Sequence, residues 1–275
     1  MPSITGLWVM VSLTLVLIVA SCAPAATPTP AAPPVTSLAP TATPATVPTP
    51  AAVTPKYGGI LKTNNRGDPA HLDLTQIKSY ASVHPLIPVY SMLMQTEPKD
   101  ATKLTTDLAE KWELSPDGKV YTFSLRNGVK FHDGNPLTSA DVKYSFEHYR
   151  NPPKGVIIQL KTALDNVERI EAPDASTVKF TLKQPQGSFL EVTSAPFMVI
   201  YPKHLLEQDP NIMKKKVVGT GPFRLKDYNR GVNLELERNP DYFVNGRPYL
   251  DGVQRYIISD PAAIMSALRT QRIQF

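Results

Sequence analysis

Cysteine is nearly absent from this sequence, and charged side chains are absent from its first 55 residues. Cys22 is the only cysteine among 275 residues, so the chain cannot form an internal disulfide. No Asp, Glu, Lys or Arg precedes Lys56, and the net charge of +5 therefore belongs to residues 56–275. A region of that length can bury a core of its own, and without a disulfide its stability must come from the burial of apolar surface.

Motifs of several enzyme classes are absent as well. The sequence contains neither an H-E-x-x-H zinc-protease helix nor a G-x-S-x-G nucleophile elbow. Gly219-Thr-Gly221 begins like a dinucleotide-binding loop, but Arg224 stands where the third glycine is needed. The carboxylates form no pair that spacing singles out as acid and base. We therefore predict a protein that is not an enzyme and that uses no cofactor.

A metal site at His132 and Asp133 is one alternative. His148 is a further potential ligand, but no fourth ligand stands at a telling spacing. Asp133-Gly134 is typical of a tight turn, and we favour this structural interpretation over a metal site.

The basic residues do not follow a nucleic-acid-binding pattern. Lys214-Lys215-Lys216 is the one basic run, and aromatic residues do not alternate with it. A solvated surface explains the run, with anionic headgroups or a partner protein as the alternative. We predict no nucleic-acid partner.

An apolar run precedes the single cysteine. Val9 to Ala20 is interrupted only by Ser12 and Thr14, which suits the core of a signal peptide and is short for a membrane span. The stretch Val19-Ala-Ser-Cys22 resembles a bacterial lipobox, in which the cysteine becomes the lipidated N-terminus. We predict a signal peptide over residues 1–21 and lipidation of Cys22; the alternative is an ordinary secretory signal, since no Lys or Arg precedes the run.

A tether follows the cysteine. Residues 23–55 contain ten prolines and no charged residue, a composition that cannot form a packed core. Proline favours the extended polyproline II conformation, so residues 22–55 are predicted to hold a folded domain away from the membrane.

The charged region shows mixed α/β patterning in which antiparallel strands predominate. Alternation predicts strands, and an N-cap, a proline stop and periodic apolar residues predict helices. Tyr121, Phe123 and Leu125 are predicted to share one strand face, and Trp112 and Phe123 are predicted to be core residues rather than ligand platforms. Strands are predicted at 119–126, at 167–171 and 177–182, which form a hairpin, and at 232–237, with Val232, Leu234 and Leu236 inward. One helix is predicted from the N-cap Thr138 to Asn151, with Val142, Phe146 and Tyr149 on one face. A second helix is predicted over 261–271, with Ile264, Met265 and Leu268 inward.

Blocks of sequence resemble one known family. The longest is LAEKWELSPDGKVYTFSLRNGVKFHDGNPLTSADVKYSF at residues 108–146, and the second is VVGTGPFRLKDYNRGVNLELERNPDYF at 217–243. Together with YPKHLLE (201–207) and GGILKTNNRGDPAHLDL (58–74), they are similar to the family 5 extracellular solute-binding proteins. Members of that family are dipeptide, oligopeptide and nickel receptors of ABC importers.

The resemblance implies a fold and partners. It implies a two-lobed fold like that of type II periplasmic binding proteins, in which lobes close around a ligand. Family members are about twice as long, so we expect residues 56–275 to be the first lobe of a truncated chain, with a mixed sheet and short helices. The implied partners are a peptide or similar solute, a permease and an ATPase, at the outer face of the cytoplasmic membrane or in the periplasm.

The resemblance also implies where ligand contacts lie. The loop after the first strand would pair its backbone with an extended ligand, as in strand addition. Elsewhere, Phe131-His-Asp-Gly134 and Gly219-Thr-Gly-Pro222 are expected to be turns that join strands, in which glycine permits a positive φ and proline presets φ. The predicted ligand contacts are Gly67, Asp68, Pro69, Ala70 and His71 in the loop, and Tyr80, His84 and Tyr90 further along.

Three alternatives remain open from the sequence. A nickel or other-solute receptor would belong to the same family. A lipid-anchored extracellular hydrolase would require a catalytic constellation. A purely structural stalk protein would explain the tether but not the family blocks.

Overall fold

The computed structural model describes residues 54–77, 79 and 83–274, and residues 53–275 form one compact unit. The predicted signal peptide, Cys22, nearly all of the tether, and Tyr80 lie outside the described residues. Within the described part, no helix has the length and apolar character needed to cross a membrane.

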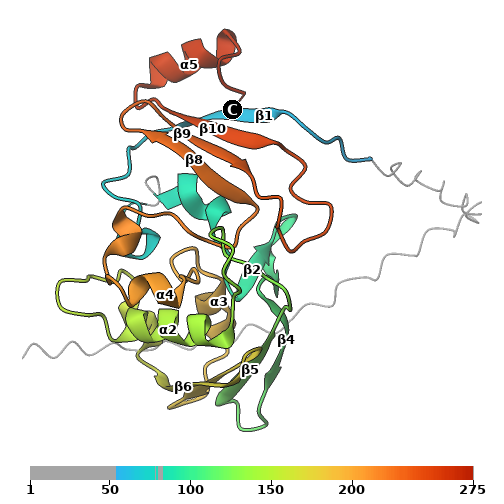
Figure 1. Cartoon of the computed structure of the whole chain (residues 1–275), viewed down its shortest axis with the longest axis vertical. Coiled ribbons are helices and arrows are strands. Elements are labelled where there is room, and N and C mark those ends of the chain that lie inside the picture. Colours follow the sequence, from blue (N-terminus) through green and yellow to red (C-terminus); the bar gives the residue numbers. More distant parts are fainter. Residues whose placement is uncertain (1–53, 78, 80–82, 275) are drawn as a thin grey trace, which may run out of the picture. The chain divides into compact units, whose positions relative to one another are not determined.

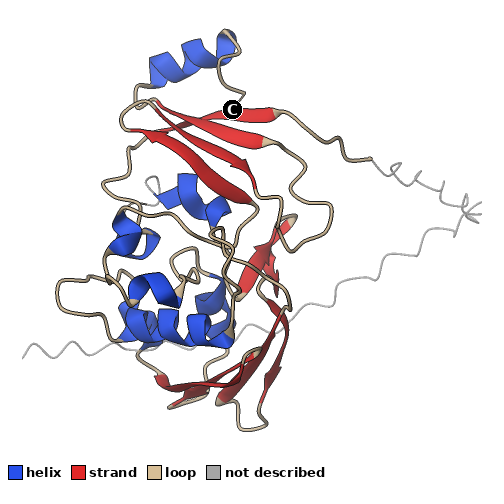
Figure 2. Ribbon diagram, in the orientation of Figure 1, coloured by secondary structure: helices blue, strands red, loops and turns tan. Residues whose placement is uncertain are grey.

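In the described part of the chain, ten strands form three sheets. Short helices lie between the sheets (Figures 1 and 2). The strands of the described region are β1 (Ile60–Asn65), β2 (Met94–Glu97), β3 (Asp100–Thr106), β4 (Ala109–Leu114), β5 (Val120–Leu125), β6 (Val167–Asp174), β7 (Thr177–Leu182), β8 (Phe223–Asn229), β9 (Asn233–Arg238) and β10 (Gly252–Ile257). Its α-helices are α2 (Ser139–Arg150), α3 (Phe189–Ser194), α4 (Lys203–Leu206) and α5 (Pro261–Arg269), and its 3-10 helices are η1 (Leu74–Gln76), η2 (His84–Val89), η3 (Lys161–Leu164) and η4 (Ile212–Lys214).

Antiparallel pairing predominates, as the sequence predicted. One sheet has the order β1-β10-β9-β8, a second is the β2–β3 hairpin, and the third has the order β4-β5-β7-β6. The exception is β1, which pairs in parallel with β10 from Ile60 opposite Gly252 to Asn65 opposite Ile257. The parallel pair brings the beginning and the end of the described region together in one sheet.

The third sheet confirms the predictions made for its strands. In β5 the side chains of Tyr121, Phe123 and Leu125 are buried, and β5 pairs with both β4 and β7. The β6–β7 hairpin is also present, with β6 three residues longer than predicted. Alternating apolar residues form these strands because one sheet face packs on helices and the other meets solvent.

Helix α2 begins where the sequence predicted. The Asp141 carboxylate accepts hydrogen bonds from the backbone N–H and the hydroxyl of Thr138, both at 2.9 Å, which satisfies donors at the helix start. Val142, Phe146 and Tyr149 are fully buried against the third sheet and the chain before α4. Asn151 ends the helix and precedes two prolines, which cannot continue it.

Three predictions about apolar side chains are wrong. Trp112 is 38% exposed, because β4 is an edge strand that has a neighbour on one side only. Val232 is 57% exposed because it lies in the turn before β9, whereas Asn233 is buried at the start of the strand. Met265 is 50% exposed, and Ala267 is the residue that α5 buries instead.

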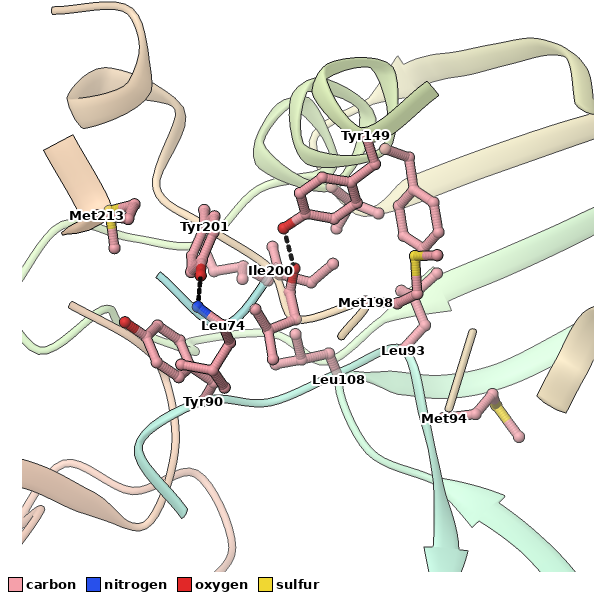
Figure 3. Packing of buried hydrophobic residues seen from close by; sticks show 14 of the residues in the cluster. Leu74, Tyr90, Leu93, Met94, Leu108, Tyr149, Met198, Ile200, Tyr201 and Met213 are labelled. Atoms are coloured by element: carbon pink, nitrogen blue, oxygen red, sulfur yellow. Dashed lines mark hydrogen bonds between the residues drawn. The ribbon is translucent and has the colours of Figure 1, made fainter. Parts of the chain in front are cut away.

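The core lies between the sheets and is built around aromatic residues (Figure 3). Tyr90 and Tyr201 meet edge to face, with ring centroids 5.3 Å apart. The Tyr149 hydroxyl donates to the carbonyl of Val199 at 2.6 Å, which ties α2 to the chain before α4. Leu93 and Leu108 are fully buried in the same cluster. This core supports η1 and η2, which flank the candidate site.

Candidate functional site

The predicted ligand loop leaves the sheet at the carboxyl end of β1. In Asn65, the last residue of β1, the side-chain amide donates to the carbonyl of Gly67, and the carbonyl of Asn65 accepts from the N–H of Ile258 after β10. Ligands of open sheets bind outside the carboxyl ends of parallel strands, where the loops diverge. The geometry therefore places the loop from Gly67 to His71 at the position in this sheet where a ligand site is expected.

Asp68 and Pro69 are held by the β8–β9 hairpin. The Asp68 carboxylate accepts from the Gly231 N–H at 2.8 Å and from the Tyr228 hydroxyl, and the same hydroxyl lies 3.2 Å from the Pro69 carbonyl. Burial and the Asp68 carboxylate raise the pKa of Tyr228 to about 12, so its hydroxyl stays protonated as a donor. Asp68 thus anchors the loop, and its carboxylate is used in contacts within the chain.

His71 lies at the end of the loop, over a buried carboxylate. Its Nδ1 is buried and lacks a hydrogen-bond partner among the described residues. Burial lowers the pKa of His71, and the Lys214 ammonium lowers it further, while the Asp73 carboxylate opposes both. A neutral imidazole at this position can accept or donate one hydrogen bond to a polar ligand.

Asp73 is a buried carboxylate that accepts several hydrogen bonds, and it was not among the residues predicted from the sequence. It is 1% exposed and accepts hydrogen bonds from the Thr75 N–H (2.9 Å), the Thr75 hydroxyl (2.7 Å), the Gln76 amide (2.7 Å) and the Tyr201 hydroxyl (3.0 Å). The Tyr201 hydroxyl also accepts from the Leu74 N–H at 3.0 Å, as Figure 3 shows. An Asp two residues before Thr is a signal for a turn, but nothing in the sequence connects it to Tyr201.

Tyr90 lies in the core rather than on an open surface. It is 3% exposed, its ring packs against Tyr201, and its hydroxyl is buried without a partner in the described structure (Figure 3). Burial and the nearby Asp73 charge raise the pKa of Tyr90 well above its usual value. In this arrangement Tyr90 supports η2 and is not available for ligand contact.

His84 is the first residue of η2 and contacts Arg255, which was not among the predicted site residues. The Nη1 atom of Arg255 on β10 lies 3.1 Å from His84 Nδ1. Burial lowers the pKa of His84, and the adjacent guanidinium lowers it further, so the imidazole is neutral. A signal was present, because Arg255 interrupts the apolar alternation of Val253 and Ile257.

The predicted turn at His132 to Gly134 is confirmed. Gly134 has a φ of 89°, and both ring nitrogens of His132 face backbone groups, the Gly221 carbonyl at 3.0 Å and the Gly219 N–H at 3.4 Å. Burial lowers the pKa of His132 to about 4. The described residues contain no group of three potential metal ligands, and His132 is used to hold the chain at Gly219.

The reason expected for Gly219 and Gly221 is wrong. Neither has a positive φ. A Cβ on Gly219 would lie 2.1 Å from the Val89 carbonyl oxygen, and one on Gly221 would lie 2.5 Å from that of Pro88. These glycines allow the chain before β8 to pass directly against η2.

Two cavities lie away from the loop. One of about 280 Å³ lies along β9 and β10 and is lined by Leu236 and Val253, and one of about 310 Å³ lies between β3 and Arg247. Neither is lined by residues 67–71. Both cavities are therefore separate from the candidate site, which is defined by the loop, η2 and the ends of the parallel strands.

Comparison with known proteins identifies the class. The model of the bacterial extracellular solute-binding proteins, family 5, matches residues 103–275, so this chain belongs to that family. The family consists of solute-binding components of ABC transporters, which act outside the cytoplasm as receptors.

Individual relatives resemble this chain over part of their length. The oligopeptide-binding protein AppA of Bacillus subtilis is 32% identical over 233 residues, which cover 80% of this chain and 41% of AppA. Its structure with a nonapeptide matches with a TM-score of 0.72 and 30% identity, over 80% of this chain and 44% of that one.

Two further structures match equally well. The periplasmic binding protein DppA of Helicobacter pylori with the peptide STSA has a TM-score of 0.73 and 31% identity, over 79% of this chain and 46% of that one. The binding protein AgaA of A. tumefaciens with agropinic acid has a TM-score of 0.73 and 32% identity, over 78% and 43%. These neighbours confirm a type II periplasmic-binding-protein fold, and the chain spans 32% to 41% of the length of the curated relatives it matches.

Proposed function

We propose that this chain is part of the substrate-binding component of an ABC importer, which binds peptides or a similar small solute outside the cell and delivers it to a permease. The observation that carries the proposal is the match over 79% of the chain to a receptor whose structure contains a peptide. The loop at the carboxyl end of β1 supports it, because an extended peptide can pair with its backbone as an added strand.

The anchor belongs to the same proposal. Signal peptidase would leave Cys22 as the lipidated N-terminus, and residues 23–55 would span the distance to the folded region. Two or more acyl chains give lasting attachment, since each buried CH₂ contributes about 0.8 kcal/mol. The receptor would then remain at the outer face of the cytoplasmic membrane near its permease and ATPase.

The ligand class is broader than peptides alone. AgaA matches this chain as well as the peptide receptors do, and its structure contains agropinic acid. We therefore extend the proposal to small acids, with peptides as the first ligands to test.

Peptide titration followed by NMR tests the proposal. We expect the purified chain to bind tripeptides with a dissociation constant of about a millimolar, near −4 kcal/mol, with shifts concentrated at the amides of residues 67–71. Weak binding is expected because the matched residues correspond to 46% of the H. pylori receptor, and a site formed by fewer residues offers fewer contacts to the ligand.

Glucose serves as the matched negative ligand, since it offers no strand to pair with the loop. Unchanged amide shifts at about ten times the expected dissociation constant would contradict the proposal. Micromolar affinity would instead mean that these residues already form a complete site.

A further inference from the structure

Arg255 is a charged residue on the apolar face of a sheet. It lies in β10 opposite Leu234 of β9 and Thr63 of β1, which are 0% and 6% exposed. Val253, two residues earlier on the same face, is 5% exposed. Since side chains alternate along a strand, the Arg255 side chain points to the buried side, toward η2 (teal in Figure 1).

The guanidinium of Arg255 has no carboxylate partner among the described residues. Its Nε is buried and makes no hydrogen bond there, and its Nη1 faces the neutral imidazole of His84. Burial lowers the pKa of Arg255, and no acidic group counteracts this effect.

Other arginines of the same sheet are paired differently. Arg224 of β8 lies 2.9 Å from the Asp241 carboxylate, and Arg238 of β9 lies 2.8 Å from that of Asp251. A partly buried cation without an anion is unfavourable, and a planar guanidinium matches a carboxylate through two parallel hydrogen bonds. Arg255 thus has the donors, the charge and the burial of an anion-binding group.

The position of Arg255 joins it to the candidate site. Arg255 lies two residues before the end of β10, and its register partner Thr63 lies two residues before the end of β1. The loop from Gly67 to His71 starts just beyond, on the side where the parallel strands end. We therefore expect a ligand that pairs with the loop from Gly67 to His71 to lie near the guanidinium of Arg255.

We propose that Arg255 binds a carboxylate of the ligand, so that the receptor selects peptides or small acids with a free carboxylate over their neutral derivatives. The inference rests on the proposed function and names its ligand chemistry. Arg255 of β10 would then determine specificity, in addition to the contacts that the loop backbone makes with the ligand.

Trialanine and its C-terminal amide are the probes, titrated into the isotope-labelled chain and followed by NMR. The wild type is expected to bind the free acid at least about tenfold more tightly than the amide, as a charge-assisted pair predicts. The Nε–H signal of Arg255, assigned from its loss in Arg255→Lys, is expected to move with the acid and not with the amide.

Substitutions test the same assignment. Arg255→Gln should reduce the affinity for the acid to that for the amide and leave the amide unchanged, while Arg255→Lys should retain part of the preference. Arg169→Gln is the matched control, because Arg169 is exposed on β6 and pairs with Glu171, and its preference should equal that of the wild type.

The outcomes separate the two proposals. Equal binding of acid and amide by the wild type, or a stationary Arg255 signal, would overturn the role of Arg255 while peptide binding stands. Binding of neither probe would overturn the proposed function and this inference together. Because the comparison of acid and amide binding by the wild type needs no substitution, it decides the matter even if Arg255→Gln does not fold.

Discussion

At the scale of single residues, two tyrosines in one cluster differ in how their hydroxyls are satisfied. The Tyr201 hydroxyl accepts from the Leu74 N–H and donates to Asp73, whereas the Tyr90 hydroxyl is buried without a partner in the described structure. Their rings are in contact, so the two positions share the same packing environment. Removal of the Tyr201 hydroxyl should therefore lower the free energy of unfolding more than removal of the Tyr90 hydroxyl.

Tyr201→Phe is expected to lower the free energy of unfolding by about 1 to 3 kcal/mol, because it leaves the Leu74 N–H without an acceptor and removes one of the three hydrogen bonds to Asp73 Oδ1. Tyr90→Phe is the matched control and is expected to be neutral or stabilising, since the lost hydroxyl has no partner. Urea unfolding at pH 7 measures both. An equal loss in the two variants would contradict the assigned hydrogen bonds.

At the scale of secondary-structure elements, Asp141 connects two helices. One carboxylate oxygen accepts from Thr138 at the start of α2, and the other accepts from the Lys203 N–H at 3.0 Å at the start of α4. Asp141 is 7% exposed, so water could not readily replace its carboxylate as the acceptor for the Thr138 and Lys203 donors. The capping pattern was visible in the sequence, but the bond to Lys203 was not.

Asp141→Ala is expected to cost about 2 to 3 kcal/mol of unfolding free energy, more than the roughly 1 kcal/mol typical of a lost cap, because α4 also loses its acceptor. Lys143→Ala in the same helix is the control, since Lys143 is exposed and its loss should change stability by less than about 0.5 kcal/mol. Thermal and urea unfolding measure both. A cost for Asp141→Ala no larger than for the control would refute the connection.

At the scale of the whole molecule, the N-terminal region is proposed to determine where the protein acts. Cys22 and nearly all of the tether lie outside the described residues, and the anchor is proposed from the sequence. Cys22→Ala is expected to move the protein from the membrane fraction to the soluble fraction, because it removes the site of acylation. Fractionation and labelling with a fatty-acid analogue measure this, with Ser21→Ala as the control that keeps the cysteine. Membrane retention of Cys22→Ala, with no label on the wild type, would reject lipidation.

The sequence by itself determined the local elements and the family. Alternation in β5, the β6–β7 hairpin and the capped start of α2 depend on residues close together in the chain, so propensity and periodicity were enough to predict them. The blocks at 108–146 and 217–243 likewise indicated the family that the comparison confirmed.

Only the tertiary structure decided burial and contacts between distant segments. Trp112 is exposed because its strand lies at a sheet edge, and Gly219 is required because its segment passes against η2. The pairing of β1 with β10 brings residues nearly 200 positions apart into register, and it places Arg255, two residues before the end of β10, at the end of the sheet where the chain leaves β1 toward residues 67–71. Strand order and close approach arise from long-range packing, which periodicity along the chain does not encode.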